Sequence, residues 1–300
     1  MSTPFFSIII PTYNRVNALS RSIDSVLSQT YKDFELIIVD NGSTDGTHQW
    51  LLDNYHDDRI TYHYKKGSGS PASPRNKGIF LSKGLWLCLL DSDDSWDKNK
   101  LQYVLNEIHT TPNVDVICHN ENLYFEMTNS QGKELKYGPA SNQMYKDMLI
   151  FGNRLSTSAT SIRAKFLRDN NLKFNELSMF ATVEDYDLWL NLAKYDAKFI
   201  FLQASLGFYT LGESNMIANS KLFCTNLNNL LKMHAFDIQQ FTEDKNKLWQ
   251  LLELRIEIIK LKLVEVSLLK KIIGITKLMI MHPINLTKII GGNFKAKLTN

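Results

Sequence analysis

The sequence contains few of the residues and segments that mark several common classes of protein. Its three cysteines, Cys88, Cys118 and Cys224, are an odd number at wide spacing without a CxxC pair, so neither a disulfide framework nor a zinc knuckle is indicated. No run approaches the roughly 20 apolar residues of a membrane-spanning helix. The apolar run at residues 5–10 follows no basic segment and stops at Pro11, so we do not expect a signal peptide. These absences favour a reduced, cytoplasmic protein.

Two nucleotide-binding signatures are also missing. The chain has neither a GxGxxG fingerprint nor a Walker lysine loop, which argues against the commonest NAD and ATP sites.

Its composition is that of an ordinary folded protein, with 44% hydrophobic, 11% aromatic and 22% charged residues. Three hundred residues are enough for one large core or two modest ones.

The net charge of +3 hides an uneven distribution along the chain. Residues 245–300 hold eleven Lys and Arg against three Glu, whereas the first 244 residues hold 23 basic against 28 acidic groups. The basic segment combines lysines with Ile, Leu and Met clusters, a pattern that suits an anionic membrane surface. Helical packing on the rest of the protein is the alternative. Nucleic-acid binding is not expected, because interleaved aromatics and dense arginine are missing there.

Short apolar runs alternate with helical patterns over the first 120 residues. Residues 5–10 and 34–40 are apolar almost throughout, as in strands buried on both faces, and apolar residues recur at helical spacing between them. We expect further strands at 60–64, 85–90 and 114–118, and further helices from Thr47, at about 73–82 and at 101–108. This alternation predicts an α/β fold that opens with a parallel sheet.

The pattern loosens after residue 120. Residues 128–142 are polar and are expected to form a loop, while short helices are expected at 144–151 and 185–195. From Ser220 onward the apolar residues follow a helical period.

Polar clusters follow three of the predicted strands where each strand ends. They lie at residues 12–14, 40–43 and 91–94. In open α/β sheets, ligands bind at the carboxyl edge of the strands. The sequence therefore predicts a ligand site at this edge.

The cluster at residues 91–94 brings three carboxylates, Asp91, Asp93 and Asp94, to the end of a buried strand. Like charges crowded there require a cation or a hydrogen-bond network, and oxygen ligands suit Mg²⁺ or Mn²⁺ bridging to phosphates. A solvated turn that caps the next helix is the alternative interpretation. The loop at 40–46 has a similar alternative, a turn with a helix N-cap. None of the seven histidines shows the spacing of paired metal ligands, so each is expected to be structural or exposed.

Four ordered motifs closely resemble those of the family 2 glycosyltransferases with the GT-A fold. They are residues 11–15 (PTYNR), 40–45 (DNGSTD), 75–78 (RNKG) and 90–94 (LDSDD). The resemblance implies an α/β GT-A fold with a mixed, mainly parallel sheet flanked by helices and a C-terminal helical extension. It further implies a catalytic domain at 1–215, with a nucleotide-sugar half (1–120) and an acceptor half (121–215), followed by a helical, basic amphipathic region at 216–300.

The same resemblance implies roles for individual residues around a UDP-sugar donor. Asn41 departs from the family, which usually has a second Asp there, and we interpret the amide as an alternative partner for the base. Relatives carry an Arg and a His near residues 208–213, whereas this chain has neither; Glu213 or water would complete the metal shell, or divalent binding would rest on Asp93 and the donor alone. The implied donor residues are Pro11, Tyr13 and Asp40 at the uracil and ribose, Asp91 on the ribose side, Arg75 holding the donor, and Asp93 binding Mn²⁺ or Mg²⁺ on the diphosphate.

Two later segments are candidates for the acceptor side. The polar stretch at 156–160 lies where such enzymes often build the acceptor floor, although an ordinary polar loop explains it equally well. Residues 183–189 (VEDYDLW) open a helix with an acid pair, Glu184 and Asp185. Acids at a helix N-terminus are favoured by the macrodipole alone. The pair also resembles the family's catalytic acidic motif, in which the second acid is the base, which would be Asp185.

The resemblance implies an inverting enzyme that moves a hexose, with glucose as the first expectation, from a UDP-sugar. With the basic C-terminal region, it suggests a lipid-linked (undecaprenyl-diphosphate) saccharide acceptor for bacterial O-antigen or capsule, at the inner face of the cytoplasmic membrane. Two alternatives are a sugar nucleotidyltransferase and a noncatalytic sugar-binding protein. The first should open with a glycine-rich phosphate loop, which is missing, and the second would not need the acids at Asp40, Asp91, Asp93 and Asp185.

Overall fold

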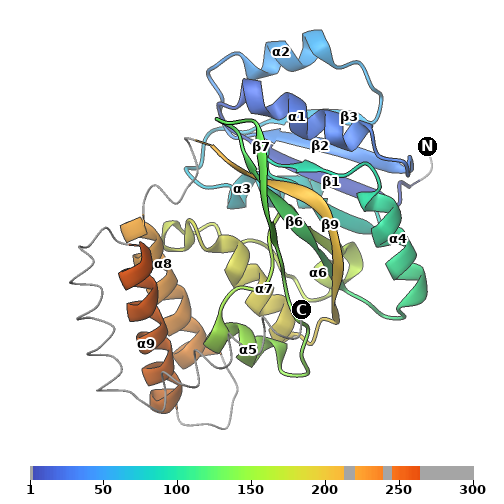
Figure 1. Ribbon diagram of the computed structural model, residues 1–300. Coiled ribbons are helices and arrows are strands. Elements are labelled where there is room, and N and C mark those ends of the chain that lie inside the picture. The colour runs from blue at the N-terminus through green and yellow to red at the C-terminus, as the bar shows by residue number, and fades with distance from the viewer. Residues whose placement is uncertain (1–2, 213–219, 239–244, 264–300) are drawn as a thin grey trace.

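A single mixed sheet runs through the computed structural model, which describes residues 3–212, 220–238 and 245–263 (Figure 1). The strand order is β3-β2-β1-β4-β8-β6-β9-β5, and β7 pairs with β6. The strands are β1 (Phe6–Thr12), β2 (Phe34–Asp40), β3 (Ile60–Tyr64), β4 (Trp86–Leu89), β5 (Ser95–Trp96), β6 (Val116–Phe125), β7 (Ser130–Leu135), β8 (Thr160–Arg163) and β9 (Phe199–Leu211). The helices are α1 (Val16–Leu27), α2 (Thr47–Asn54), α3 (Ala72–Leu81), α4 (Lys100–Thr110), α5 (Met144–Phe151), α6 (Ala164–Asp169), α7 (Glu184–Lys194), α8 (Ser220–Met233) and α9 (Lys245–Leu263), with short segments η1 (Ser178–Phe180) and η3 (His234–Ile238).

The N-terminal half is a parallel sheet in which β1, β2 and β4 are buried on both faces. β3, β2, β1 and β4 pair in parallel, as the apolar runs predicted. Successive side chains of a strand point to opposite faces. Ile8 and Ile10 accordingly pack with α1, α2 and α4, whereas Ile9 packs in the second core with α3 and the later helices. This half places the ends of β1, β2 and β4 at one edge of the sheet.

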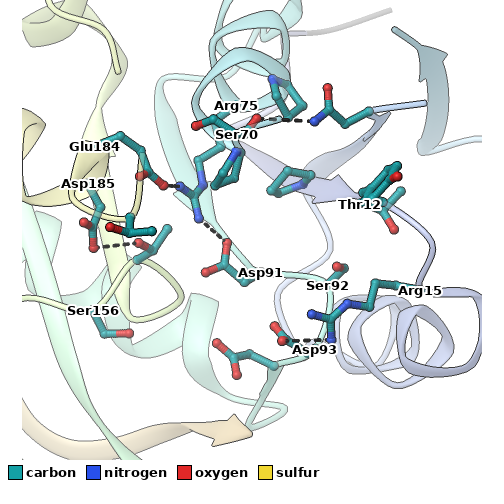
Figure 2. A pocket seen from close by; sticks show the side chains of 18 of the residues that line it. Thr12, Arg15, Ser70, Arg75, Asp91, Ser92, Asp93, Ser156, Glu184 and Asp185 are labelled. Atoms are coloured by element: carbon teal, nitrogen blue, oxygen red, sulfur yellow. Dashed lines mark hydrogen bonds and ion pairs between the residues drawn. The ribbon is translucent and has the colours of Figure 1, made fainter. Parts of the chain in front are cut away.

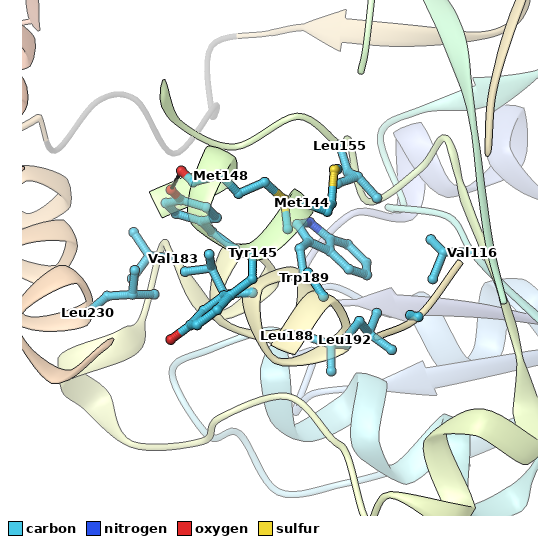
Figure 3. Packing of buried hydrophobic residues seen from close by; sticks show 14 of the residues in the cluster. Val116, Met144, Tyr145, Met148, Leu155, Val183, Leu188, Trp189, Leu192 and Leu230 are labelled. Carbon is cyan, nitrogen blue, oxygen red and sulfur yellow. Dashed lines mark hydrogen bonds between the residues drawn. The ribbon is translucent and has the colours of Figure 1, made fainter. Parts of the chain in front are cut away.

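The second core surrounds α7. Leu188, Trp189 and Leu192 of this helix are fully buried and pack with Met144 and Met148 of α5 (Figure 3). Leucine positions of α8 and α9 belong to the same core: Leu227, Leu230, Leu231, Leu248 and Leu252. The described C-terminal helices therefore pack on the sheet-bearing part of the chain, next to α5 and α7 (Figure 1).

The predicted GT-A fold class is confirmed, but the second half of the sheet was not expected. β6 is longer than predicted, antiparallel β8 lies between β4 and β6, and the long β9 pairs in parallel with β6. The prediction of a loop over 128–142 is wrong in part, because residues 130–135 form β7. β7 is mostly exposed and pairs only with β6 among the described strands, so its sequence SQGKEL carries no apolar alternation.

The basic residues from 264 onward, on which the membrane-surface prediction chiefly rests, lie outside the described residues. Within the described ranges, no helix has both the length and the apolar content that crossing a membrane demands.

All three cysteines are free thiols in the interior, and burial raises the pKa of Cys118 to about 12.

Candidate active site

A cavity of about 940 Å³ opens at the edge where β1 and β4 end, between α3 and the first turn of α7. Its walls come from both halves of the chain (Figure 2). Seven of the eight predicted site residues line it: Pro11, Tyr13, Arg75, Asp91, Asp93, Glu184 and Asp185. The structure therefore brings the predicted donor residues and the predicted acid pair to one place.

Asp40 lies behind this wall. Its side chain is only 1% exposed, and its carboxylate accepts hydrogen bonds from the Tyr62 hydroxyl and the Ser43 backbone N–H, both at 2.7 Å. These contacts fix the turn that follows β2. Asp40 therefore shapes the turn beside the cavity.

The neighbouring Asn41 lines the cavity but uses its amide within the protein. Its oxygen accepts from the backbone and hydroxyl of Ser68, at 3.1 and 2.9 Å, and its nitrogen donates to the Ser70 carbonyl at 3.3 Å. These bonds fasten residues 67–70, which form part of the cavity wall. Gly42 faces Gly67 so closely, at a φ of +93°, that a Cβ there would lie 2.8 Å from the Gly67 nitrogen. Only glycine fits the Gly42 turn.

Arg75 is the central charged group of the cavity. It is 4% exposed, and its guanidinium donates to Asp91 at 2.6 Å and to Glu184 at 2.8 Å (Figure 2). Burial by itself would lower the pKa of Arg75, but Asp91 and Glu184 raise it above its ordinary value. The side chain thereby ties α3 to the end of β4 and to the start of α7.

The three carboxylates of the predicted metal-binding loop have two different roles. Asp94 is buried, and its side chain accepts from the Ser158 hydroxyl at 2.5 Å and from the Thr210 backbone N–H at 2.8 Å. Asp93 faces the cavity and pairs with Arg15 at 3.2 Å. Burial, and then the charge of Asp91, raise the pKa of Asp93. Asp94 thus holds the loop, while Asp91 and Asp93 face the space that a ligand would occupy.

The donor set fits a hard divalent cation. Asp91 and Asp93 place carboxylates on the same cavity, and Mg²⁺ is usually bound by one or two carboxylates together with substrate phosphates and water. Within the described ranges, no cluster of three or more His, Cys, Asp or Glu side chains forms a complete metal site. Glu213, the other candidate ligand, lies outside the described residues.

The acid pair of α7 has two different environments. Glu184 is 3% exposed and accepts from Arg75, whereas Asp185 is half-buried, accepts from the Tyr186 backbone N–H at 2.6 Å and lies 3.4 Å from the Thr157 hydroxyl. Burial, and then the charge of Glu184, raise the pKa of Asp185 to about 7, while Arg75 acts in the opposite direction. Asp185 is therefore the acid of this pair that is available to a ligand.

Several wall residues were not found from the sequence. Ser156 and Thr157, from the predicted acceptor stretch, do line the cavity, but Arg15 and Tyr137 were not expected to do so. Tyr137 donates its hydroxyl to the buried Glu121 at 2.8 Å. PTYNR contains Arg15, so the motif marks its position, whereas no sequence signal marks Tyr137. Further wall residues missed from the sequence are Thr182, Tyr209, Thr210, Ser220 and Phe223.

Comparisons with known proteins agree with this geometry. Residues 7–172 match Glycosyl transferase family 2. The chain is 33% identical over 196 residues to the Escherichia coli UDP-Glc:alpha-D-GlcNAc-diphosphoundecaprenol beta-1,3-glucosyltransferase WfaP, covering 62% of this chain and 69% of that protein. It is 30% identical over 200 residues to an uncharacterized glycosyltransferase of Rickettsia felis, covering 64% of this chain and 32% of that protein. The chain thus spans about a third of the length of this second relative.

Solved structures show the same fold at low sequence identity. S. aureus TarS 1-349 in complex with UDP-GlcNAc superposes with a TM-score of 0.62 at 21% identity, covering 86% of this chain and 73% of that one. The mannosyltransferase PcManGT from Pyrobaculum calidifontis, in complex with GDP-Man and Mn²⁺, gives a TM-score of 0.56 at 12% identity, covering 100% and 87%. Because the family match covers more than half of the chain, the protein belongs to glycosyl transferase family 2 and is a glycosyltransferase with the GT-A fold.

Proposed function

We propose that the protein transfers a hexose, with glucose as the first candidate, from a UDP-sugar to a lipid-linked saccharide with inversion at the anomeric carbon. The observation that carries this proposal is that the donor motifs and Asp185 line the same cavity. The names of two similar proteins support the donor class, because WfaP uses UDP-Glc and TarS was crystallised with UDP-GlcNAc.

The donor half of the cavity offers contacts for a nucleoside diphosphate. Tyr13 is 56% exposed at the cavity and presents a ring on which a base can stack, next to Pro11. Asp40 supports this region by holding the Ser43 turn. Arg75 and Asp91 lie deeper in the cavity, where ribose and diphosphate would follow.

Asp93, with Asp91, would hold Mn²⁺ or Mg²⁺ on the diphosphate. The cation would supply positive charge against the negative charge that grows on the departing UDP. The raised pKa of Asp93 supports this assignment, because a crowded carboxylate gains from a nearby cation.

Asp185 is the proposed general base. Its raised pKa, about 7, leaves it deprotonated in a large fraction of molecules at neutral pH and basic enough to take a hydroxyl proton. As the acceptor oxygen attacks the anomeric carbon, its proton passes to an Asp185 carboxylate oxygen and the bond to the UDP oxygen breaks. Glu184 is unsuited to this task, because it is buried and paired with Arg75.

The acceptor is proposed to be a saccharide linked to undecaprenyl diphosphate, as in assembly of bacterial O-antigen or capsule. The name of WfaP contains such an acceptor, and the basic residues 245–300 would bring the enzyme to the anionic inner face of the cytoplasmic membrane. The enzyme would then act from the cytoplasm as a peripheral membrane protein.

The test is release of UDP from a panel of UDP-sugars, with and without Mn²⁺, upon addition of a lipid-linked saccharide acceptor. We expect acceptor-dependent UDP release with at least one donor and a roughly 10²- to 10⁴-fold lower rate in Asp185→Asn, the usual contribution of positioned acid–base catalysis. UDP affinity should barely change in this variant. Near-normal turnover in Asp185→Asn together with a loss in Glu184→Gln would reject the assignment of the base.

A further inference from the structure

The segment that leads into α7 contains a residue in an unfavourable backbone conformation. Thr182 has a φ of +75° and lines the cavity three residues before Asp185. For a β-branched residue this left-handed conformation is a genuine outlier that raises the energy of the folded chain. Such a conformation persists only where neighbouring contacts impose it.

A side chain from α8 makes one such contact. Asn226 is 2% exposed, and its amide nitrogen donates to the carbonyl oxygen of Ala181 at 2.6 Å. That carbonyl belongs to the peptide group between Ala181 and Thr182. Because the φ of Thr182 describes how this peptide group is rotated about the N–Cα bond, a hydrogen bond that holds the carbonyl in place also restricts φ.

The same C-terminal helices hold α7 beyond its first turn. His234 of η3 lies 3.0 Å from the Asp187 carboxylate, and both side chains are buried. Arg255 of α9 donates to the Tyr186 hydroxyl at 3.1 Å. Asp185 therefore lies between a strained residue on one side and two residues anchored by the C-terminal helices on the other.

We propose that Asn226 is a positioning residue that keeps Thr182 left-handed and thereby sets the place of Asp185 in the cavity. The proposal rests on the proposed function, in which Asp185 is the base. In this proposal α8 helps to position the base. Without the Asn226 hydrogen bond, the 181–182 peptide group can rotate toward a less strained conformation, and the first turn of α7 moves with it.

The first experiment replaces Asn226 with Leu, which has a similar size but no donor. A misplacement of about 1 Å can cost on the order of 10²-fold in rate. We therefore expect kcat to fall about 10- to 100-fold, while the dissociation constant for UDP changes less than about threefold. Asn228→Leu, a change of the same kind at a half-buried position of α8, is the control and should leave both values unchanged. Should Asn226→Leu not fold, Asn226→Ser, whose side chain is too short to reach Ala181, takes its place.

The decisive comparison uses Thr182→Asn, because asparagine adopts the left-handed conformation much more readily than threonine. In a Thr182→Asn background, the loss of kcat caused by Asn226→Leu should shrink to less than about threefold. An equal loss in both backgrounds, an unchanged kcat in Asn226→Leu, or a loss of UDP affinity in proportion to rate would each overturn the proposal. Asp185→Asn separates the proposed base from the proposed role of Asn226. Normal turnover in Asp185→Asn rejects Asp185 as the base. A loss of turnover in Asp185→Asn together with full activity of Asn226→Leu rejects only the role of Asn226.

Discussion

Asp185 combines a raised pKa with access to the cavity, and this gives its pH dependence a definite sign. A general base acts in its deprotonated form, so kcat/KM should rise with pH, pass half of its maximum near pH 7 and level off above about pH 8. In Asp185→Asn this limb should disappear, leaving a low rate that changes little with pH. A pH profile of UDP release measures both. A rising limb that persists in Asp185→Asn would assign the titration to another group.

Protonation of Asp185 also affects stability in a predictable direction. Its pKa in the folded protein lies above the ordinary value of 3.8, so the folded state binds this proton more tightly than the unfolded state. This contribution to stability is present below the unfolded pKa and is lost as pH rises through about 7. Asp185→Asn should therefore have a higher Tm than the native protein at pH 8, and the difference should vanish near pH 4. A lower Tm at pH 8 would contradict this.

At Asp93 the corresponding change removes a ligand for a hard cation. Asp93→Asn should abolish turnover and make UDP binding independent of Mn²⁺, because a neutral amide is a far weaker ligand than a carboxylate. Titration calorimetry of UDP with and without Mn²⁺ measures the effect. Asp53→Asn, on the exposed face of α2, is the matched control. Metal-dependent UDP binding of unchanged strength in Asp93→Asn would refute the assignment.

Sequence reasoning selects residues that stand in motifs, whereas a residue that is defined by its tertiary contacts carries no such signal. Some site residues occur in sequence patterns that indicate their chemistry without a structure, as do Pro11, Arg75, Asp91 and Asp185. Asn226 lies 41 residues beyond Asp185, and nothing in its neighbourhood on α8 distinguishes it from an ordinary helical asparagine. Its hydrogen bond exists only because the second core packs α8 against η1, next to the segment that leads into α7.

At the scale of elements, Arg75 joins α3 to α7 through a buried ion pair with Glu184, and to the end of β4 through a partly exposed ion pair with Asp91. Arg75→Met removes the positive charge and leaves Glu184 buried without a partner, which typically costs about 3–5 kcal/mol. We expect chemical denaturation to show a loss of this size. Arg59→Met, which breaks the half-exposed pair of Arg59 with Asp57, should cost less than about 1 kcal/mol.

A double variant separates the ion pairs from simple packing. In Arg75→Met with Glu184→Gln, the uncompensated charge at Glu184 is gone, so part of the lost stability should return. If the loss of unfolding free energy in the double variant equals the sum of the losses in Arg75→Met and in Glu184→Gln, the two residues do not interact energetically.

The helices and strands whose bounds could be predicted are those whose environment changes little along their length. The bounds of β2 and α5 were predicted correctly, because apolar runs and helical periodicity reflect local burial. The bounds of β3 were also predicted correctly, although it is an edge strand without a buried residue, because its sequence ITYHY is rich in β-branched and aromatic residues. β9 alternates less clearly: its residues are mostly half-buried, and it pairs with β6 on one side and with β5 on the other. β8 contains Thr160 and Ser161, whose burial is decided by partners far away in the sequence. Such strands are determined by the sheet and not by their own composition.

At the scale of the whole molecule, the C-terminal region divides into a part that belongs to the core and a part beyond the described residues. A chain that ends before α8 would uncover the apolar surfaces of η1 and α5 on which α8 and α9 pack, so we expect it to be insoluble. A chain that ends at residue 267 keeps α8 and α9 and should fold with the Tm of the full chain. The soluble fraction of each truncation after expression, and thermal unfolding of the soluble protein followed by circular dichroism, measure this. A soluble, cooperatively folding chain ending at residue 219 would contradict it.

The same truncation at residue 267 tests the membrane proposal. Residues 268–300 include six lysines, so their removal should shift the protein from the membrane to the soluble fraction while activity on a short soluble acceptor survives. High salt should weaken binding of the full chain to anionic vesicles, because it screens the lysine charges. Equal partition into neutral and anionic vesicles at every salt concentration would reject the electrostatic contribution.

The buried state of all three cysteines has a practical consequence. Cys88, Cys118 and Cys224 are enclosed, and burial raises the pKa of Cys118 and Cys224, so the reactive thiolate is scarce in the folded protein. Thiol-directed fluorophores should therefore label the native chain very little. A single cysteine introduced on the exposed surface, for instance in place of Leu177, would accept a label selectively beside η1 and α7. Fluorescence from that one position could then follow acceptor entry in real time, without first removing any natural cysteine.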